Sequence, residues 1–138
     1  MTRRALREHC FKMLFSTDFC APAEADGQID AYLCEVPDEE DESPEFSEEE
    51  RKICRERVKA VLDKREEIDD ILQQASSGWS LRQMGRVELT ILRLACFELR
   101  FDENIPEKVA INEAVELAKK FGGEEAPSFV NGVLAKLV

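Results

Sequence analysis

The stretch RVELTILRLACFEL, residues 86–99, decides the fold predicted for this chain. Its apolar residues recur at helical spacing and cover so much of the helix surface that the helix has to be buried. We therefore expect a central helix that ends near Arg100. Leu, Ala, Glu, Lys and Arg dominate the rest of the sequence, and no alternating pattern indicates a strand. Because this composition favours helices, the sequence predicts an all-α protein.

Capping signals and helical periodicity place six or seven helices, which we expect to pack as two subdomains at 1–75 and 76–138. Thr2 is a candidate N-cap for a first helix that runs from near Arg3 to Phe19. The other helices are expected at 28–35, 47–75, 79–85, 86–100, 106–121 and 127–138. Pro106 and Pro127 each suit the first turn of a helix, since proline has no amide hydrogen to lose there.

The long helix predicted at 47–75 carries two capping boxes. In this motif a side chain caps the helix start, and a glutamate three residues later reaches back to the first amide. Ser47 with Glu50 marks the start of the helix. Asp63 with Glu66 is a second such pair, so we expect a bend that divides the segment into two helices.

Acidic residues are concentrated in one part of the chain. The formal net charge is −11, and the segment from Glu35 to Glu50 holds ten acidic residues and no basic one, which leaves about −1 for the rest. Self-repulsion, two prolines and the lack of apolar anchors predict that Val36–Phe46 is a solvated, mobile linker. The linker is a spacer, an intramolecular competitor for the basic residues, or a segment without consequence.

The first helix holds more basic than acidic residues, and aromatic residues accompany them. At 100° per residue, Arg3, Arg4, Arg7, Phe11 and Phe15 fall within a sector about 120° wide. Guanidinium groups neutralise phosphates, and aromatic rings offer stacking surfaces to unpaired bases. This face therefore fits single-stranded RNA. The alternative is a solvated arginine face with both phenylalanines in the core.

Catalysis and metal binding find little support in the sequence. The five cysteines are scattered without a CxxC pair, and His9 is the only histidine, so no ligand cluster for zinc is expected. His9 and Cys10 are neighbours on one helix and point about 100° apart, which excludes a nucleophile–base pair. We expect no enzyme activity, no metal and no cofactor. Unpaired thiols, with no signal peptide or membrane span, predict a cytoplasmic protein.

Three stretches resemble the NusB family of transcription antitermination factors. They are Arg3–Phe15, Arg86–Leu99 and Pro106–Leu134, and the most specific part is VAINEAVELAK followed by FVNGVL. The resemblance implies an all-α fold without catalysis. It also implies binding to boxA RNA in ribosomal RNA leaders together with NusE, a small-subunit ribosomal protein. The pair would then join the RNA polymerase elongation complex with other Nus factors.

The resemblance also implies roles for individual residues. RNA contacts are expected from Arg3, Arg4, Arg7, Phe15, Glu125 and Phe129. Phe15 stands where the family commonly has tyrosine, so it can stack on a base but lacks the hydroxyl. Glu88, with the neighbouring Arg86, is expected to face NusE. From the pattern alone, Glu88 is instead an exposed helix residue paired with Arg86 or Arg93.

Two alternatives compete with the antitermination role. A similar helical domain precedes the catalytic domain of some rRNA cytosine methyltransferases, but no cofactor-binding segment follows the last predicted helix here. The second alternative is a homodimeric interaction protein that hides its arginine face. Overall acidity indicates that RNA binding would be weak without a basic partner, whose lysines would neutralise much of the phosphate charge.

Overall fold

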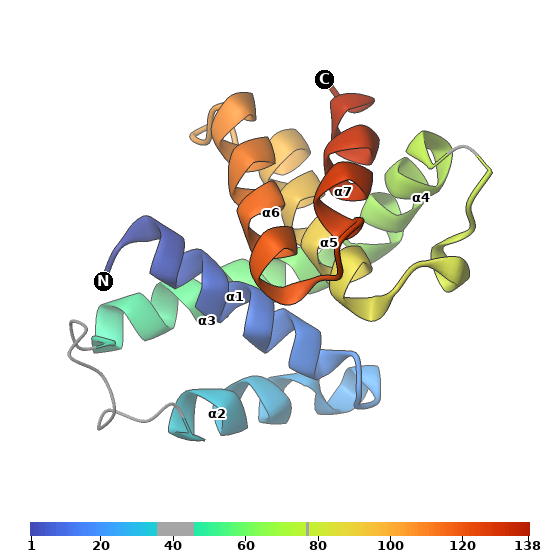
Figure 1. Ribbon diagram of the computed structural model, residues 1–138. Coiled ribbons are helices and arrows are strands. Elements are labelled where there is room, and N and C mark those ends of the chain that lie inside the picture. The colour runs from blue at the N-terminus through green and yellow to red at the C-terminus, as the bar shows by residue number, and fades with distance from the viewer. Residues whose placement is uncertain (36–45, 77) are drawn as a thin grey trace. The chain divides into compact units, whose positions relative to one another are not determined.

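The computed structural model of the protein describes residues 1–35, 46–76 and 78–138. Every regular element within these residues is helical, which confirms the all-α prediction. Figure 1 shows their order along the chain. The elements are α1 (Arg3–Thr17), η1 (Pro22–Glu24), α2 (Ala25–Glu35), α3 (Glu48–Asp63), α4 (Arg65–Ala75), η2 (Leu81–Gln83), α5 (Arg86–Phe101), α6 (Glu107–Phe121) and α7 (Ala126–Ala135), where η denotes a short 3-10 helix.

The chain forms two compact units, Met1–Ala60 and Val61–Val138. This division differs from the boundary at 75/76 expected from the sequence. The physical reason is that α4 packs against α5 and α7, so it belongs with the second unit rather than the first. α3 crosses the division within its last turn.

In the first unit α1 packs against α2, and local signals define where α1 begins. The Thr2 hydroxyl accepts a hydrogen bond from the Ala5 amide at 3.0 Å, which confirms Thr2 as the N-cap. The core of this unit is apolar and includes Cys10, Met13, Leu14, Ile29, Leu33, Cys54 and Val58.

The predicted capping box at the start of α3 is present. The Ser47 amide donates to Glu50 Oε1 at 3.0 Å, and the Glu50 amide donates to the Ser47 hydroxyl at 3.1 Å. The bond from the Ser47 amide is the largest of the interactions that lower the pKa of the Glu50 carboxyl. The bend between α3 and α4 is also confirmed, but the predicted box of Asp63 and Glu66 is wrong. α4 starts after Lys64, which makes no capping bond with its side chain.

Phe46 is buried, contrary to the expectation that Val36–Phe46 is solvated throughout. Residues 36–45 of that predicted linker lie outside the described residues. The Phe46 ring stacks on His9 with centroids 4.5 Å apart, and the Arg51 guanidinium lies 4.8 Å from the ring centre. His9 in turn shares a 2.8 Å hydrogen bond with the Tyr32 hydroxyl. Phe46 therefore provides an apolar anchor for the end of an otherwise acidic segment.

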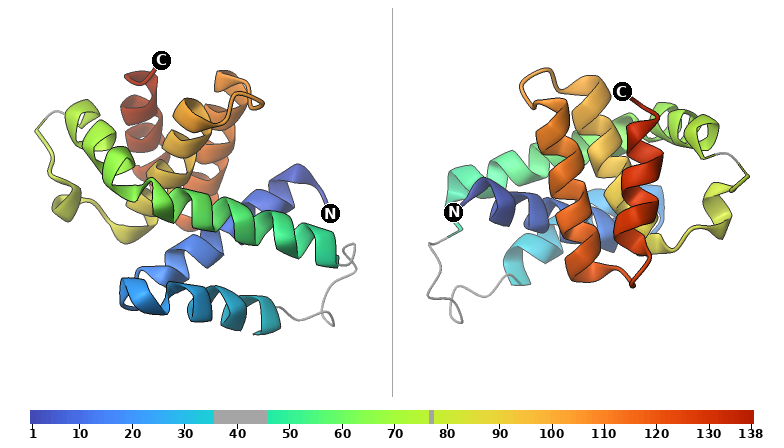
Figure 2. Two further views of the ribbon diagram at one scale, coloured as in Figure 1. Left: turned by 180° about the vertical axis from the view of Figure 1, so that it is seen from behind. Right: turned by 45° about the horizontal axis from the view of Figure 1, so that its top comes forward.

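The second unit is built around α5, as the sequence predicts. All side chains from Leu89 to Cys96 on this helix are buried. α5 contacts α4, α6 and α7, and Figure 2 shows α5, α6 and α7 side by side. The helix that carries the densest apolar pattern is thus the one that the others cover.

One buried residue of α5 is charged. Arg93 donates from Nε and Nη2 to the two carboxylate oxygens of Asp69 on α4, at 2.9 and 3.0 Å. This paired geometry is the strongest form of an arginine–carboxylate contact. The sequence pattern offered Arg93 as one possible partner of Glu88 on the same helix. In the structure Arg93 instead pairs with Asp69 on the neighbouring helix α4.

We expect Asp69→Ala to lower the free energy of unfolding by about 2–3 kcal/mol, because it leaves the buried Arg93 guanidinium without its carboxylate. Asp70→Ala is the matched control, since Asp70 is the next residue and is exposed, and it should change stability by less than about 0.5 kcal/mol. Urea unfolding followed by circular dichroism measures both values. Equal stabilities for the two variants would contradict a structural role for the pair.

The cysteines differ in exposure, which predicts their reactivity. Burial raises the pKa of the Cys96 thiol to about 11, whereas Cys34 is exposed. The thiolate is the nucleophile, so we expect Cys96 to stay unmodified by a thiol reagent at pH 8 until the protein unfolds. Cys34 should react in the folded protein, and peptide mass spectrometry after timed labelling identifies the modified residues. Rapid labelling of Cys96 in the folded state would contradict its burial.

Candidate nucleic-acid interface

The predicted arginine face lies at the start of α1. Arg3 and Arg4 are exposed and Arg7 is half-buried. The first turn of α1 holds no acidic residue, so these cations lie at the positive end of the helix dipole without a neighbouring carboxylate in that turn. Such a surface attracts anions and suits a phosphate backbone.

The aromatic residues of α1 divide between core and surface. Phe11 is only 3% exposed and belongs to the core, whereas Phe15 is half-buried. The Phe15 ring lies 6.0 Å from Phe11 and meets Phe19 edge-on at 5.1 Å. Phe19 is 61% exposed and was not among the predicted site residues. The four-residue spacing of the three phenylalanines was the signal in the sequence for a continuous aromatic row.

The predicted residues Glu125 and Phe129 lie on one face of α7. Glu125 is the exposed N-cap residue, and its carbonyl accepts the Phe129 amide at 3.0 Å, one turn along the helix. Phe129 is half-buried and contacts Trp79 edge-on, with centroids 5.9 Å apart and planes at 71°. Trp79 was also missed by the sequence analysis, since nothing local links it to a residue 50 positions further along.

Glu88 and Arg86 both lie in the first turn of α5. Arg86 is exposed, while Glu88 is half-buried and its carboxylate lies against two glycines. A Cβ atom at Gly85 would overlap Glu88 Oε2, and one at Gly122 would lie 3.5 Å from Glu88 Oε1. The carboxylate therefore occupies the space between the start of α5 and the end of α6. The predicted contact of Glu88 and Arg86 with a protein partner stays a prediction.

The predicted residues divide between the two units. Arg3, Arg4, Arg7 and Phe15 share α1 in the first unit, and Glu125, Phe129, Arg86 and Glu88 lie in the second. The described residues contain no group of three or more His, Cys, Asp or Glu side chains that could hold a metal ion. None of the described helices is both long and apolar enough to cross a membrane.

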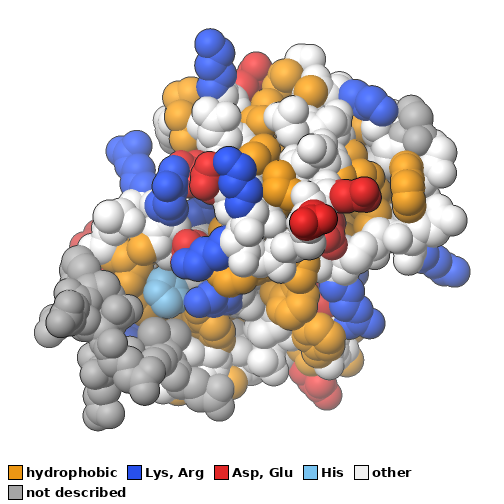
Figure 3. All heavy atoms as spheres, viewed as in Figure 1, with side chains coloured by type: hydrophobic (Ala, Val, Ile, Leu, Met, Phe, Trp, Pro, Cys, Tyr) orange, Lys and Arg blue, Asp and Glu red, His pale blue; other side chains and the backbone are white. Residues whose placement is uncertain are grey.

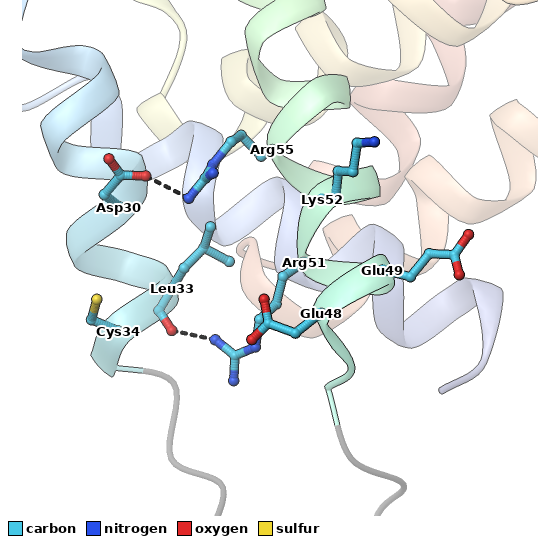
Figure 4. A pocket seen from close by; sticks show the side chains of 8 residues that line it. All are labelled: Asp30, Leu33, Cys34, Glu48, Glu49, Arg51, Lys52 and Arg55. Atoms are coloured by element: carbon cyan, nitrogen blue, oxygen red, sulfur yellow. Dashed lines mark hydrogen bonds and ion pairs between the residues drawn. The ribbon is translucent and has the colours of Figure 1, made fainter.

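A cavity of about 770 Å³ opens between the end of α2 and the start of α3 (Figure 4). Two of its arginine side chains are already engaged with the protein itself. Arg55 pairs with Asp30 at 2.6 Å, and Arg51 donates to the Leu33 carbonyl. We therefore assign no chemistry to this cavity. It is lined by Asp30, Leu33, Cys34, Glu48, Glu49, Arg51, Lys52 and Arg55.

Comparisons with known proteins give one consistent result. The chain matches the model of the NusB family over residues 4–138. Transcription antitermination protein NusB of Lachnoclostridium phytofermentans is 49% identical over 100% of this chain and 99% of its own length. The protein of the same name from Agathobacter rectalis is 43% identical, over 99% of this chain and 98% of its own.

Two solved structures share the fold. NusB of T. maritima aligns with a TM-score of 0.81 at 31% identity, covering 99% of this chain and 90% of its own. A chain from the crystal structure of a plectonemic RNA supercoil aligns with a TM-score of 0.75 at 27% identity, covering 96% and 91%. The similarity thus extends over nearly the whole chain in both comparisons.

The two glycines around Glu88 should respond differently to alanine. We expect Gly85→Ala to change stability by less than about 1 kcal/mol, because only the flexible end of Glu88 has to move away. Gly122→Ala should cost about 1–3 kcal/mol, since its Cβ would lie 2.5 Å from Ala126 Cβ and 2.9 Å from the Ala118 carbonyl oxygen. Thermal unfolding compares the two variants. A larger loss for Gly85→Ala would show that the position of Glu88 is rigid.

Proposed function

The chain belongs to the NusB family, whose curated relatives are transcription antitermination proteins, and from this we propose that it binds boxA-type leader RNA of ribosomal RNA operons together with NusE. The family is a family of transcription factors and not a known family of enzymes. In this proposal the RNA–protein complex joins the RNA polymerase elongation complex with other Nus factors and suppresses premature termination.

The observation that carries the proposal is the exposed arginine face at the start of α1. Arg3 and Arg4 are exposed at the positive end of α1, whose first turn holds no acidic residue, and Phe15 adds a partly exposed ring about three turns further on. Each guanidinium that contacts a phosphate releases a condensed counterion, which contributes affinity at low salt. An arginine face with an adjacent ring suits a flexible single strand better than a duplex, because the bases of a single strand are free to stack.

The charge of the chain explains why a partner is needed. A net charge of −11 repels RNA at long range, so the arginine face alone provides limited attraction. A basic ribosomal protein bound nearby would supply the missing positive charge. We place NusE beside Arg86 and Glu88, because both lie in the first turn of α5 and Arg86 is exposed there. Glu125 and Phe129 would contact the RNA from the second unit.

The test is a titration of labelled boxA-type RNA with and without NusE at several salt concentrations. We expect NusE to tighten binding and added salt to weaken it, because phosphate contacts release counterions. Arg4→Ala or Arg7→Ala should weaken binding several-fold and reduce the salt slope by about 0.7 for each lost contact to a single strand. Fluorescence anisotropy measures both quantities.

Lys12→Ala is the matched control for these variants. It removes one positive charge from the same helix, but Lys12 lies outside the arginine sector. If Lys12→Ala lowers the RNA affinity as much as Arg4→Ala does, the effect of the arginine variants is due to net charge alone. If no RNA binds in either condition, the proposal is wrong, and light scattering then tests whether a homodimer covers the arginine face.

A further inference from the structure

Trp79 is the only tryptophan of the chain, and it is 52% exposed. A large aromatic ring that stays in water does not contribute the stabilising free energy that its burial in the core would give. Hydrophobic side chains that reach the surface stand among charged ones in the space-filling view (Figure 3). A ring of this size in such a position needs an explanation other than packing.

The backbone around Trp79 is held in place by several hydrogen bonds. The Trp79 amide donates to the Ser76 carbonyl at 2.9 Å, and the Gln73 side chain donates to the Trp79 carbonyl at 2.8 Å. The same Gln73 side chain accepts the Leu81 amide at 3.2 Å. Gly78, with φ of 81°, allows the tight turn that precedes the ring. These bonds tie the backbone at Trp79 and Leu81 to the end of α4, which lowers the entropy lost when the indole binds a ligand.

The immediate neighbours of the indole favour a nucleic-acid base over a phosphate. Phe129 meets Trp79 edge-on, and this arrangement joins the two rings into one aromatic surface. Glu125 lies one turn before Phe129 on the same helix face, and its carboxylate is exposed. A carboxylate repels phosphate, but it accepts hydrogen bonds from the amino groups on base edges. Arg82, exposed on η2 three residues after Trp79, offers a cation for the strand that carries the base.

We propose that Trp79 and Phe129 form a stacking platform for one unpaired base of the bound RNA, with Glu125 accepting from the amino group of that base. This proposal rests on the proposed RNA-binding function and adds a residue and a base-level contact to it. The stacked base carries an exocyclic amino group, so adenine, cytosine or guanine fits the site better than uracil.

The intrinsic fluorescence of Trp79 provides a direct test, because no other tryptophan contributes to the signal. Titration of the full-length protein with boxA-type single-stranded RNA in the presence of NusE should quench the emission of Trp79. A titration with NusE alone is the reference for any change in Trp79 emission that the partner causes. A NusE variant without tryptophan is used if NusE itself contributes to the emission. Anisotropy of labelled RNA records binding independently of the tryptophan signal.

Three variants separate stacking from other effects. Trp79→Ala should weaken RNA binding about tenfold, as expected for the loss of one base–aromatic stack. Trp79→Phe keeps an aromatic face and should stay within about threefold of the parent protein. Ile53→Ala is the control for loss of an exposed apolar side chain, since Ile53 is 48% exposed, and it should bind normally. Circular dichroism confirms that each variant is folded.

Replacing single RNA positions with abasic nucleotides then locates the stacked base. Removal of the base at one position should abolish the quenching of Trp79. The same removal should lower the RNA affinity of the parent protein but not that of Trp79→Ala. If the parent protein binds RNA while Trp79 emission is unchanged and Trp79→Ala binds equally well, the stacking proposal is wrong and the proposed function stands. If Trp79→Ala weakens binding to NusE alone, the platform serves a protein partner and the proposal is also wrong. If the parent protein binds no RNA, both proposals fail.

Discussion

The guanidinium of Arg93 is buried on α5, and both oxygens of the Asp69 carboxylate hold it there. A charge in this position is tolerated only with a well-placed counter-charge, because desolvation would otherwise cost several kcal/mol. The requirement fixes which face of α4 meets α5 and where along its length. Ile68 and Leu72, which flank Asp69 on α4, are fully buried. The pair joins two helices of the second unit, in which α4 packs against α5 and α7.

The sequence predicted those parts of the fold that local chemistry determines. Thr2 and the Ser47–Glu50 box set helix starts through contacts within one turn, and such contacts can be identified from spacing alone. The errors arose where distant residues decide the structure. Phe46 is buried because His9, 37 positions earlier, offers a ring to stack on, and the charge count around Phe46 gives no sign of that. The start of α4 after Lys64 likewise differs from what the local capping signal indicates.

The candidate interface shows the same limit in a different form. A helical wheel places Phe11 and Phe15 in one sector with the arginines, but it cannot say how far the core extends around the helix. In the structure the edge of the core passes between them, so Phe11 is buried and Phe15 is partly exposed. Trp79 was absent from the predicted site for a related reason. Its contact with Phe129 joins a loop to a helix 50 residues later, and no periodic pattern spans that distance.

The packing of Glu88 against Gly85 and Gly122 has a consequence for how this sequence can evolve. The three positions form an epistatic set, in which the effect of one substitution depends on the residues already present at the others. An alanine that became fixed at position 85 would exclude the carboxylate from its present place, and later substitutions could then adapt to that new arrangement. Reversion to glycine would afterwards no longer restore the original packing by itself. The order in which mutations arise at these positions, and not only their final combination, therefore decides which later sequences can evolve from this one.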